Sequence, residues 1–142
     1  MKNLKYLILI GLGVLSCGIS AQIAQYNFKI TNETKDNLKI WVEIGTDRPG
    51  IKAKCKGASF DLQSKQSQVI PREAPCQLTQ IKVQKINEQA QPLEKEATKL
   101  MGEGEYYSAR APQRMISIKK GFRVLGLGSQ YKLSPSPVTY GD

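Results

Sequence analysis

Apolar and polar side chains alternate along most of this chain, which predicts β-strands because neighbouring side chains of a strand point to opposite faces. In YNFKIT (26–31), one face carries Tyr26, Phe28 and Ile30. In LKIWVEI (38–44), the apolar face carries Leu38, Ile40, Val42 and Ile44, and the other face carries Lys39, Trp41 and Glu43. Turn formers in NETKDN (32–37) separate the two runs, so we expect them to form an antiparallel pair.

Further segments with strand-like patterns are IKAKCK (51–56), SFDL (59–62), VIPREAP (69–75), CQLTQIKVQKI (76–86), EYYSAR (105–110), RMISIKK (114–120) and FRVLGLGSQYKL (122–133). The longest of them, 76–86, changes phase along its length. Cys76 and Leu78 favour one face, whereas Ile81 and Val83 favour the other. A β-bulge near Leu78–Thr79 would bring all four side chains to the same face.

The alternation stops at 87–104, where PLEKEATKLM (92–101) predicts either a short helix with Pro92 in its first turn or a long loop. The tail SPSPVTYGD (134–142) has two prolines and little to bury, which predicts a flexible end. Seven to nine short strands with close turns predict an all-β, antiparallel β-sandwich of immunoglobulin-like strand count, with a barrel as the alternative. We therefore expect one sandwich domain over 22–133.

The N-terminus predicts export. Lys2 and Lys5 precede an apolar run, Tyr6 to Leu15, and small polar residues follow, as in a secretory signal peptide over 1–21. The run is about ten residues long, which is too short for a spanning helix, and no second run predicts a transmembrane segment in the mature chain. Cleavage before Gln22 would give a secreted or periplasmic protein. Acylation of Cys17 is the alternative, and it would give an outer-membrane lipoprotein.

Either processing route leaves Cys55 and Cys76 out of three cysteines. An even pair in an oxidising compartment predicts a disulfide bond, which would stabilise the fold by roughly 3 kcal/mol. Two buried free thiols are the alternative.

An N-terminal export signal, a compact β-pattern and one cysteine pair together form a layout that resembles the small single-domain β-sandwich exoproteins that Gram-negative bacteria release by type II secretion. The resemblance implies a bacterial exoprotein, directed at a host or a surface and connected with virulence. It carries over no catalytic residue.

The absence of histidine excludes several kinds of chemistry. Ser-His-Asp and Cys-His nucleophiles, histidine-ligated zinc and the HExxH motif all require it. The chain also lacks GxxxxGK[ST] and a GxGxxG after a strand, so no phosphate-binding loop is expected. The turns offer too few acids for a calcium loop. We expect no cofactor and no metal ion.

Chemistry that uses only carboxylates remains open. Glycoside hydrolysis needs two acids that face each other across a cleft, and the candidates are Glu43, Asp61, Glu103 and Glu105. The alternative is that all four are solvated surface acids, and we expect a protein that is not an enzyme.

Positive charge is the more informative feature. Loss of Lys2 and Lys5 with the signal peptide leaves 19 basic and 12 acidic residues, a net charge of +7. A row of three lysines in 51–56 and the cations of the C-terminal strands would share one face if these strands are neighbours. The predicted anionic-ligand face comprises Lys52, Lys54, Lys56, Arg110, Arg114, Lys119 and Arg123. The alternative is that these side chains only keep the sheet soluble and protect its edges.

Aromatic side chains would complete this face. Trp41 is on the outward parity of its strand, and one of Tyr106 and Tyr107 must face outward if that strand forms. The sequence therefore predicts a secreted, non-enzymatic, monomeric binding protein. Its expected partner is an anionic glycan or other polymer, a membrane surface or a host protein, without sequence-specific recognition of nucleic acid. The alternatives are an envelope accessory lipoprotein acylated at Cys17 and a carboxylate-only hydrolase.

Overall fold

The computed structural model describes residues 26–46, 55–72, 75–108, 113–121 and 130–139 of the 142-residue chain. The predicted signal peptide and Cys17 therefore lie outside the described residues. The strands are β1 (Tyr26–Asn32), β2 (Asn37–Thr46), β3 (Ala58–Leu62), β4 (Ser67–Arg72), β5 (Cys76–Ile86), β6 (Thr98–Lys99), β7 (Glu105–Tyr106), β8 (Gln113–Lys120), β9 (Tyr131–Ser134) and β10 (Val138–Thr139). The described part is all-β, as predicted.

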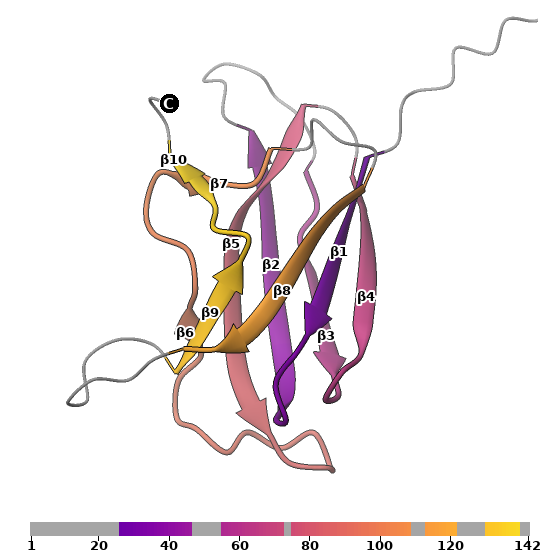
Figure 1. The fold of residues 1–142 in the computed structure, drawn as a ribbon, viewed down its shortest axis with the longest axis vertical. Helices are drawn as coiled ribbons and strands as arrows, with labels where there is room; N and C mark the ends of the chain where they lie inside the picture. The colour runs from indigo at the N-terminus through magenta and orange to yellow at the C-terminus, as the bar shows by residue number, and fades with distance from the viewer. Residues whose placement is uncertain (1–25, 47–54, 73–74, 109–112, 122–129, 140–142) are drawn as a thin grey trace, which may run out of the picture.

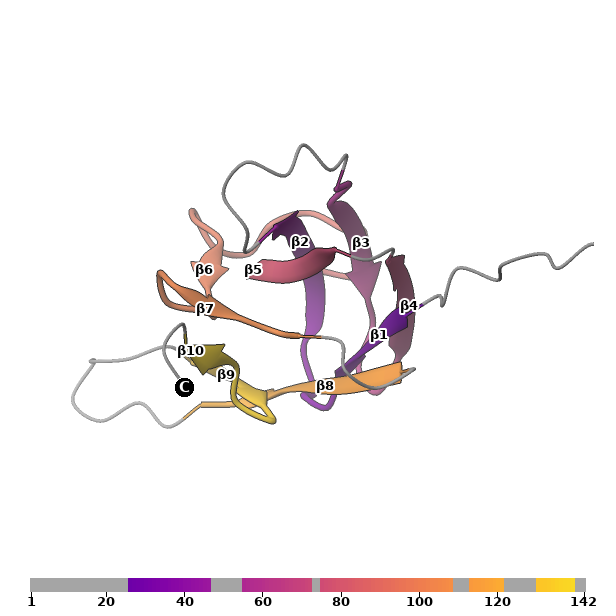
Figure 2. The same cartoon turned by 90° about the horizontal axis from the view of Figure 1, so that it is seen from above.

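Two four-stranded sheets form the layers of a β-sandwich (Figure 1). Sheet 1 has the order β4-β1-β8-β9, and sheet 2 has the order β3-β2-β5-β6. A short ribbon of β7 and β10 lies at the side of the sandwich where β6 and β9 end the two sheets (Figure 2). The described sheets are open rather than closed into a barrel, so the sandwich interpretation is the correct one.

The expected pairing of β1 with β2 is wrong. β1 pairs with β4 and, in parallel, with β8, whereas β2 pairs with β3 and β5 in the other sheet. The turn between β1 and β2 carries the chain from one layer to the other, so their apolar faces meet across the core. Alternation alone does not distinguish these arrangements, because each of them buries the same side chains.

The core lies between the sheets, and it contains the side chains that the alternating pattern assigns to the apolar faces of the strands. Phe28 and Ile30 of β1 and Leu38 and Ile40 of β2 are fully buried. The β-bulge is also confirmed, because Glu43 pairs with Gln80 while Ile44 pairs with Leu78, which leaves Thr79 as the extra residue. The core cluster comprises Phe28, Ile30, Leu38, Ile40, Val42, Ile44, Leu62, Ile70, Cys76, Leu78, Ile81, Val83, Met101, Tyr107, Ile116, Ile118, Tyr131 and Leu133.

Segment 92–101 forms no helix, so that interpretation is wrong and the loop alternative holds for most of it. Pro92 forms a bridge with Ile86, the Leu93 amide donates to the Lys85 carbonyl, and the Leu100 amide donates to the Ile81 carbonyl. The chain therefore runs back along the edge of β5 and adds β6 to sheet 2. Tertiary pairing of the backbone has outweighed a weak local helix preference.

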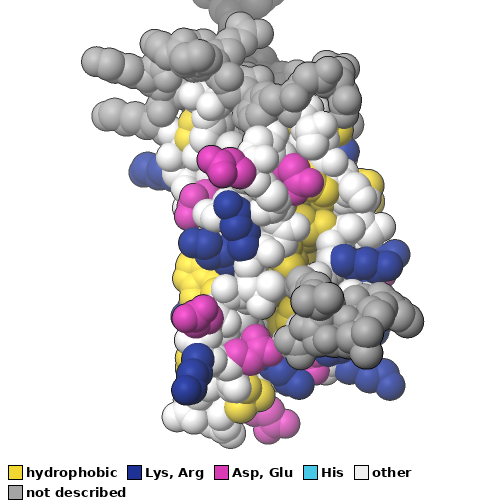
Figure 3. Space-filling view, turned by 90° about the vertical axis from the view of Figure 1, so that its left-hand side faces the viewer, with side chains coloured by type: hydrophobic (Ala, Val, Ile, Leu, Met, Phe, Trp, Pro, Cys, Tyr) yellow, Lys and Arg dark blue, Asp and Glu magenta, His cyan; other side chains and the backbone are white. Residues whose placement is uncertain are grey.

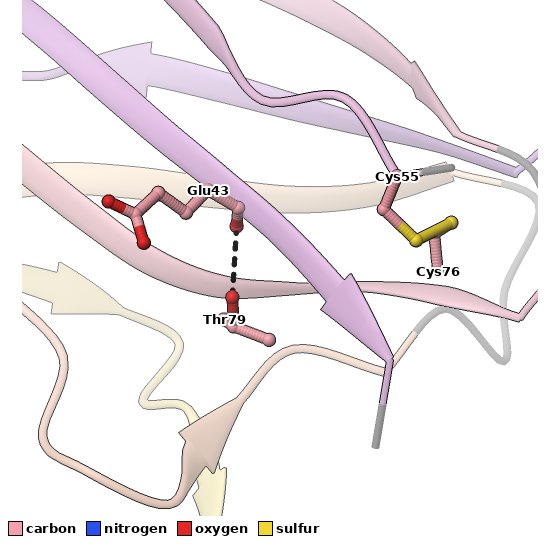
Figure 4. The surroundings of a disulfide bond; sticks show 4 residues. All are labelled: Glu43, Cys55, Cys76 and Thr79. Carbon is pink, nitrogen blue, oxygen red and sulfur yellow. Dashed lines mark hydrogen bonds between the residues drawn. A yellow bond between two sulfur atoms is a disulfide. The ribbon is translucent and has the colours of Figure 1, made fainter. Parts of the chain in front are cut away.

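The predicted disulfide joins Cys55 and Cys76, whose Cα atoms lie 5.7 Å apart (Figure 4). Cys55 and Lys56 do not belong to a strand, and the remainder of the expected strand, 51–54, lies outside the described residues. Gly57 allows this segment to approach β2 closely, since a Cβ atom there would lie 2.4 Å from the Val42 carbonyl oxygen. The bond thus fixes the start of β5 to the segment that precedes β3.

The turn between β1 and β2 links the two sheets at one end of the sandwich. Asn32, the acceptor of an N-E-T sequon, is completely buried, and its amide donates to the Asp36 and Leu62 carbonyl groups. The Asp36 carboxylate contacts Lys85 of sheet 2 at 3.0 Å, and it also accepts hydrogen bonds from Lys120 and Tyr131 of sheet 1. This turn is therefore a polar cross-link between the layers.

The C-terminal segment that the sequence predicts to be a flexible tail is part of the fold at 134–139. β10 pairs with β7, and the Tyr107 hydroxyl donates a hydrogen bond to the Pro135 carbonyl. None of the described residues belongs to an apolar helix with the length needed to span a bilayer.

Candidate functional site

The cations of the predicted anionic-ligand face do not form one face where the structure describes them. Arg114 points inward with the core side of β8, and its guanidinium lies 5.2 Å from the centre of the Tyr107 ring. Lys119 lies on the outer face of sheet 1 and forms an ion pair of 3.5 Å with Glu33. Lys56 is exposed beside Cys55, before a strand of sheet 2. The other four, Lys52, Lys54, Arg110 and Arg123, lie outside the described residues.

The aromatic residues are also separated. Tyr107 is completely buried, so its ring is not available as a ligand contact, and burial raises its pKa well above the usual range. It packs between the layers, because its amide donates to the Leu78 carbonyl of β5 while Arg114 of β8 covers its ring. Tyr106 is half-buried in β7. Trp41 keeps the predicted outward position, half-buried on the outer face of sheet 2.

Strand register builds a cationic surface around Trp41. Lys82 of β5 is the direct cross-strand partner of Trp41, and Lys99 of β6 is the partner of Lys82. Lys39, two residues before Trp41, places its ammonium group 5.7 Å from the centre of the indole ring. We call Lys39, Trp41, Lys82 and Lys99 the Trp41 face.

Acidic side chains border the Trp41 face. Glu43 lies 4.0 Å from Lys82, and Asp61 of β3 is the cross-strand partner of Lys39. Lys82 and Lys99 face each other directly, and like charges in such a pair repel and destabilise the sheet. An anion bound between these lysines would remove the repulsion, so the surface is suited to a negatively charged ligand.

An open cleft of about 210 Å³ adjoins the Trp41 face at Glu43 and Lys99. Its wall includes the bulge of β5, where the Thr79 hydroxyl donates to the Glu43 carbonyl (Figure 4), and the loop 102–105. Gly104 allows the turn of this loop, since its φ of 80° is unfavourable for other residues. The cleft brings together Glu43, Glu103 and Glu105, three of the four predicted acids, whereas Asp61 lines a separate cavity of about 110 Å³.

Acidic and basic side chains are mixed on the side of the sandwich that carries β6, β7 and β10 (Figure 3). The Glu105 carboxylate accepts a hydrogen bond from the Gly102 amide, and the Glu94 carboxylate accepts one from the Gln130 side chain.

Among the described residues, no group of three or more cysteine and acidic side chains is placed to hold a metal ion.

Sequence reasoning missed Lys82 and Lys99 as site residues. The pattern QIKVQKI puts Lys82 on the outer parity of its strand, which is a usable signal. The sequence around Lys99 gives no such signal, because this residue lies in the segment 92–101, whose pattern is also compatible with a helix. Only the pairing of β6 with β5 places Lys99 beside Lys82.

No family model matches the chain, and no curated protein matches it in sequence. Among solved structures, the human-specific toxin intermedilysin matches 66% of this chain and 20% of its own, with 16% identity and a TM-score of 0.35. A structure described as the sugar-binding protein pneumolysin matches 66% and 20%, with 17% identity and a TM-score of 0.36. The membrane-binding domain of pneumolysin matches 66% and 85%, with 15% identity and a TM-score of 0.33.

The matched part of this chain spans about a fifth of the length of the intermedilysin chain and of the sugar-binding pneumolysin chain. The resemblance to type II-secreted exoproteins stays a prediction. The disulfide is the observation that indicates an oxidising compartment outside the cytoplasm.

Proposed function

We propose that this chain is an exported, non-enzymatic binding protein and that its Trp41 face binds an anionic glycan. The observation that carries the proposal is strand register, because it aligns Trp41, Lys82 and Lys99 across three strands on the outer face of sheet 2.

The chemistry of the Trp41 face suits a sugar with sulfate or carboxylate substituents. An indole ring offers a flat apolar surface on which a sugar ring can stack, and neighbouring ammonium groups attract the anionic substituents. Within the described residues, the exposed large apolar side chains are Val69, Leu93 and Met115, and none of them is in β2, β3, β5 or β6. The face therefore lacks the aliphatic groups that would favour insertion into lipid.

Heparin, used as a sulfated-glycan probe, tests the proposal. We expect the exported protein to bind heparin with an affinity that falls steeply from low to moderate salt. The double variant Lys82→Gln, Lys99→Gln should bind about tenfold more weakly, since each substitution removes an ionic contact worth about 0.5–1 kcal/mol at a solvent-accessible surface. The double variant Lys35→Gln, Lys65→Gln is the matched control, because both exposed lysines lie in turns outside the two sheets. Equal heparin affinity of Lys82→Gln, Lys99→Gln and of this control would remove the Trp41 face as the binding site.

A second candidate is hydrolysis by carboxylates in the cleft, because Glu43, Glu103 and Glu105 all line it. Two of them already have partners, Lys82 for Glu43 and the Gly102 amide for Glu105. A screen of glycoside substrates followed by Glu43→Gln, Glu103→Gln and Glu105→Gln would test this candidate. Turnover that no variant lowers would eliminate it.

A further inference from the structure

We propose that the outer face of sheet 1 is a second binding surface, separate from the Trp41 face, and that its partner is an anionic lipid membrane. The surface consists of Lys29, Val69, Met115, Lys119 and Lys132, which we call the Met115 face. All five are on outward positions of their strands, because the alternate residues Ile30, Ile70, Ile116, Ile118 and Leu133 are buried in the core.

Two exposed aliphatic side chains flank a lysine in the middle of this face. Lys29 of β1 is the cross-strand partner of both Val69 in β4 and Met115 in β8. Val69 is 42% exposed and Met115 is 58% exposed. Adjacent strands are about 4.8 Å apart, so both apolar groups lie within roughly 10 Å of each other on the sheet surface.

Two further lysines extend the face along β8 and β9. Lys119 and Lys132 are direct cross-strand partners, so two ammonium groups lie side by side on this face, and a single acid, Glu33, lies 3.5 Å from Lys119. None of the outward positions of β4, β1, β8 and β9 carries an acid. Glu33, which follows β1, pairs with Lys119 and leaves Lys29 and Lys132 without an acidic partner among the ion pairs described.

Polar groups between these residues suit the headgroup layer. One row across the sheet consists of Ser67, Thr31, Ser117 and Ser134, and the Thr31 and Ser67 hydroxyl oxygens are 2.8 Å apart. Peripheral proteins bind anionic membranes through two kinds of contact. Their lysines contact the lipid phosphate groups, and their apolar side chains enter the interface. A glycan makes no comparable use of Val69 and Met115, which is why the observations favour lipid on this face.

Vesicle sedimentation tests the inference. The exported protein carrying Cys17→Ser, so that acylation cannot contribute, is mixed with vesicles of phosphatidylcholine alone or of equal parts phosphatidylcholine and phosphatidylglycerol. We expect binding to the anionic vesicles only. Lys29→Gln and Lys132→Gln should each weaken partitioning about fivefold, and Met115→Ser should weaken it about tenfold.

Leu93→Ser is the matched control for Met115→Ser, because Leu93 is 56% exposed and lies outside sheet 1. Lys35→Gln is the control for the lysines, because this exposed lysine lies in the turn between β1 and β2 and belongs to neither face. Thermal unfolding of each variant shows that its fold is retained. Equal effects of Met115→Ser and Leu93→Ser, no preference for anionic vesicles, or an effect of Lys35→Gln as large as that of Lys29→Gln and Lys132→Gln would each overturn the inference. Because the heparin experiment depends on the other sheet, failure of either proposal leaves the other one standing.

Discussion

The hydroxyl of Tyr131 donates a hydrogen bond of 2.9 Å to the carboxylate of Asp36, ninety-five positions earlier in the chain. Tyr131 belongs to sheet 1, and the same carboxylate lies 3.0 Å from the ammonium group of Lys85 in sheet 2. Only 13% of the Asp36 side chain is exposed, so these contacts are partly protected from water. One carboxylate therefore holds together the ends of both layers.

Removal of this carboxylate should destabilise the protein strongly. Asp36→Asn would leave Lys85 and Lys120 close to each other without an acid between them. We expect a loss of about 2–3 kcal/mol in the free energy of unfolding, measured by urea denaturation. Asp61→Asn is the control, because this exposed acid should change stability by less than about 0.5 kcal/mol. Equal stability of the two variants would show that the cross-link contributes little.

The same site should make stability depend on acid pH. Partial burial acts to raise the pKa of Asp36, but hydrogen bonds from Lys120, Lys85 and Tyr131 outweigh it and lower the pKa from 3.8 to about 2. The unfolded chain therefore binds this proton more readily, so the stabilisation is complete above about pH 4 and is lost as pH falls through 2. The loss should approach about 2 kcal/mol, and it should be absent in Asp36→Asn. Identical pH profiles of both proteins between pH 5 and 2 would contradict this assignment.

The disulfide should contribute to stability without contributing to binding. Cys55 and Cys76 close a loop with a sequence separation of 21 residues, for which the chain-entropy model gives about 3 kcal/mol. Cys55→Ala together with Cys76→Ala should lower the free energy of unfolding by about this amount. Heparin affinity should be unchanged under conditions where the variant is folded, since neither cysteine belongs to the Trp41 face.

Arg114 should behave as a structural residue rather than as a ligand contact. Its guanidinium covers the buried Tyr107 ring and donates to the Ser108 carbonyl at 3.3 Å. Arg114→Ala should therefore lower the free energy of unfolding by about 1–2 kcal/mol and leave heparin affinity nearly unchanged. A large loss of heparin affinity in a stable Arg114→Ala variant would return Arg114 to the binding face that the sequence predicts.

The direction of a side chain was predictable where apolar and polar residues alternate regularly over a long stretch. The alternation in β2 alone predicts that Trp41 points outward and Ile40 inward, and the phase change in β5 predicts a bulge near Leu78–Thr79, which the structure has at Thr79. Pairing between strands was not predictable in the same way. β1 and β2 are both amphipathic, and such strands satisfy burial equally well as neighbours in a sheet or as partners across a core.

The candidate site depends on that missing information. Lys82 and Lys99 become neighbours only through the register of β5 with β6, and Lys29 meets Met115 only through a parallel pair formed by strands far apart in sequence. Likewise, Tyr106 and Tyr107 are adjacent in sequence, so one side chain points inward and the other outward, but the alternation does not say which. The bridge between Tyr107 and Leu78 determines that Tyr107 is the buried one. Counting charges along the chain could not establish these contacts.

Quenching of tryptophan fluorescence by acrylamide tests the central claim most directly, because Trp41 is the only tryptophan in the chain and every change in signal reports on it. If heparin binds over the Trp41 face, saturation with heparin should reduce the quenching constant about twofold or more and shift the emission to shorter wavelength, as expected for an indole ring covered by a ligand. The Lys82→Gln, Lys99→Gln variant should require correspondingly more heparin for the same change. Saturable heparin binding with unaltered quenching and emission of Trp41 would contradict the account.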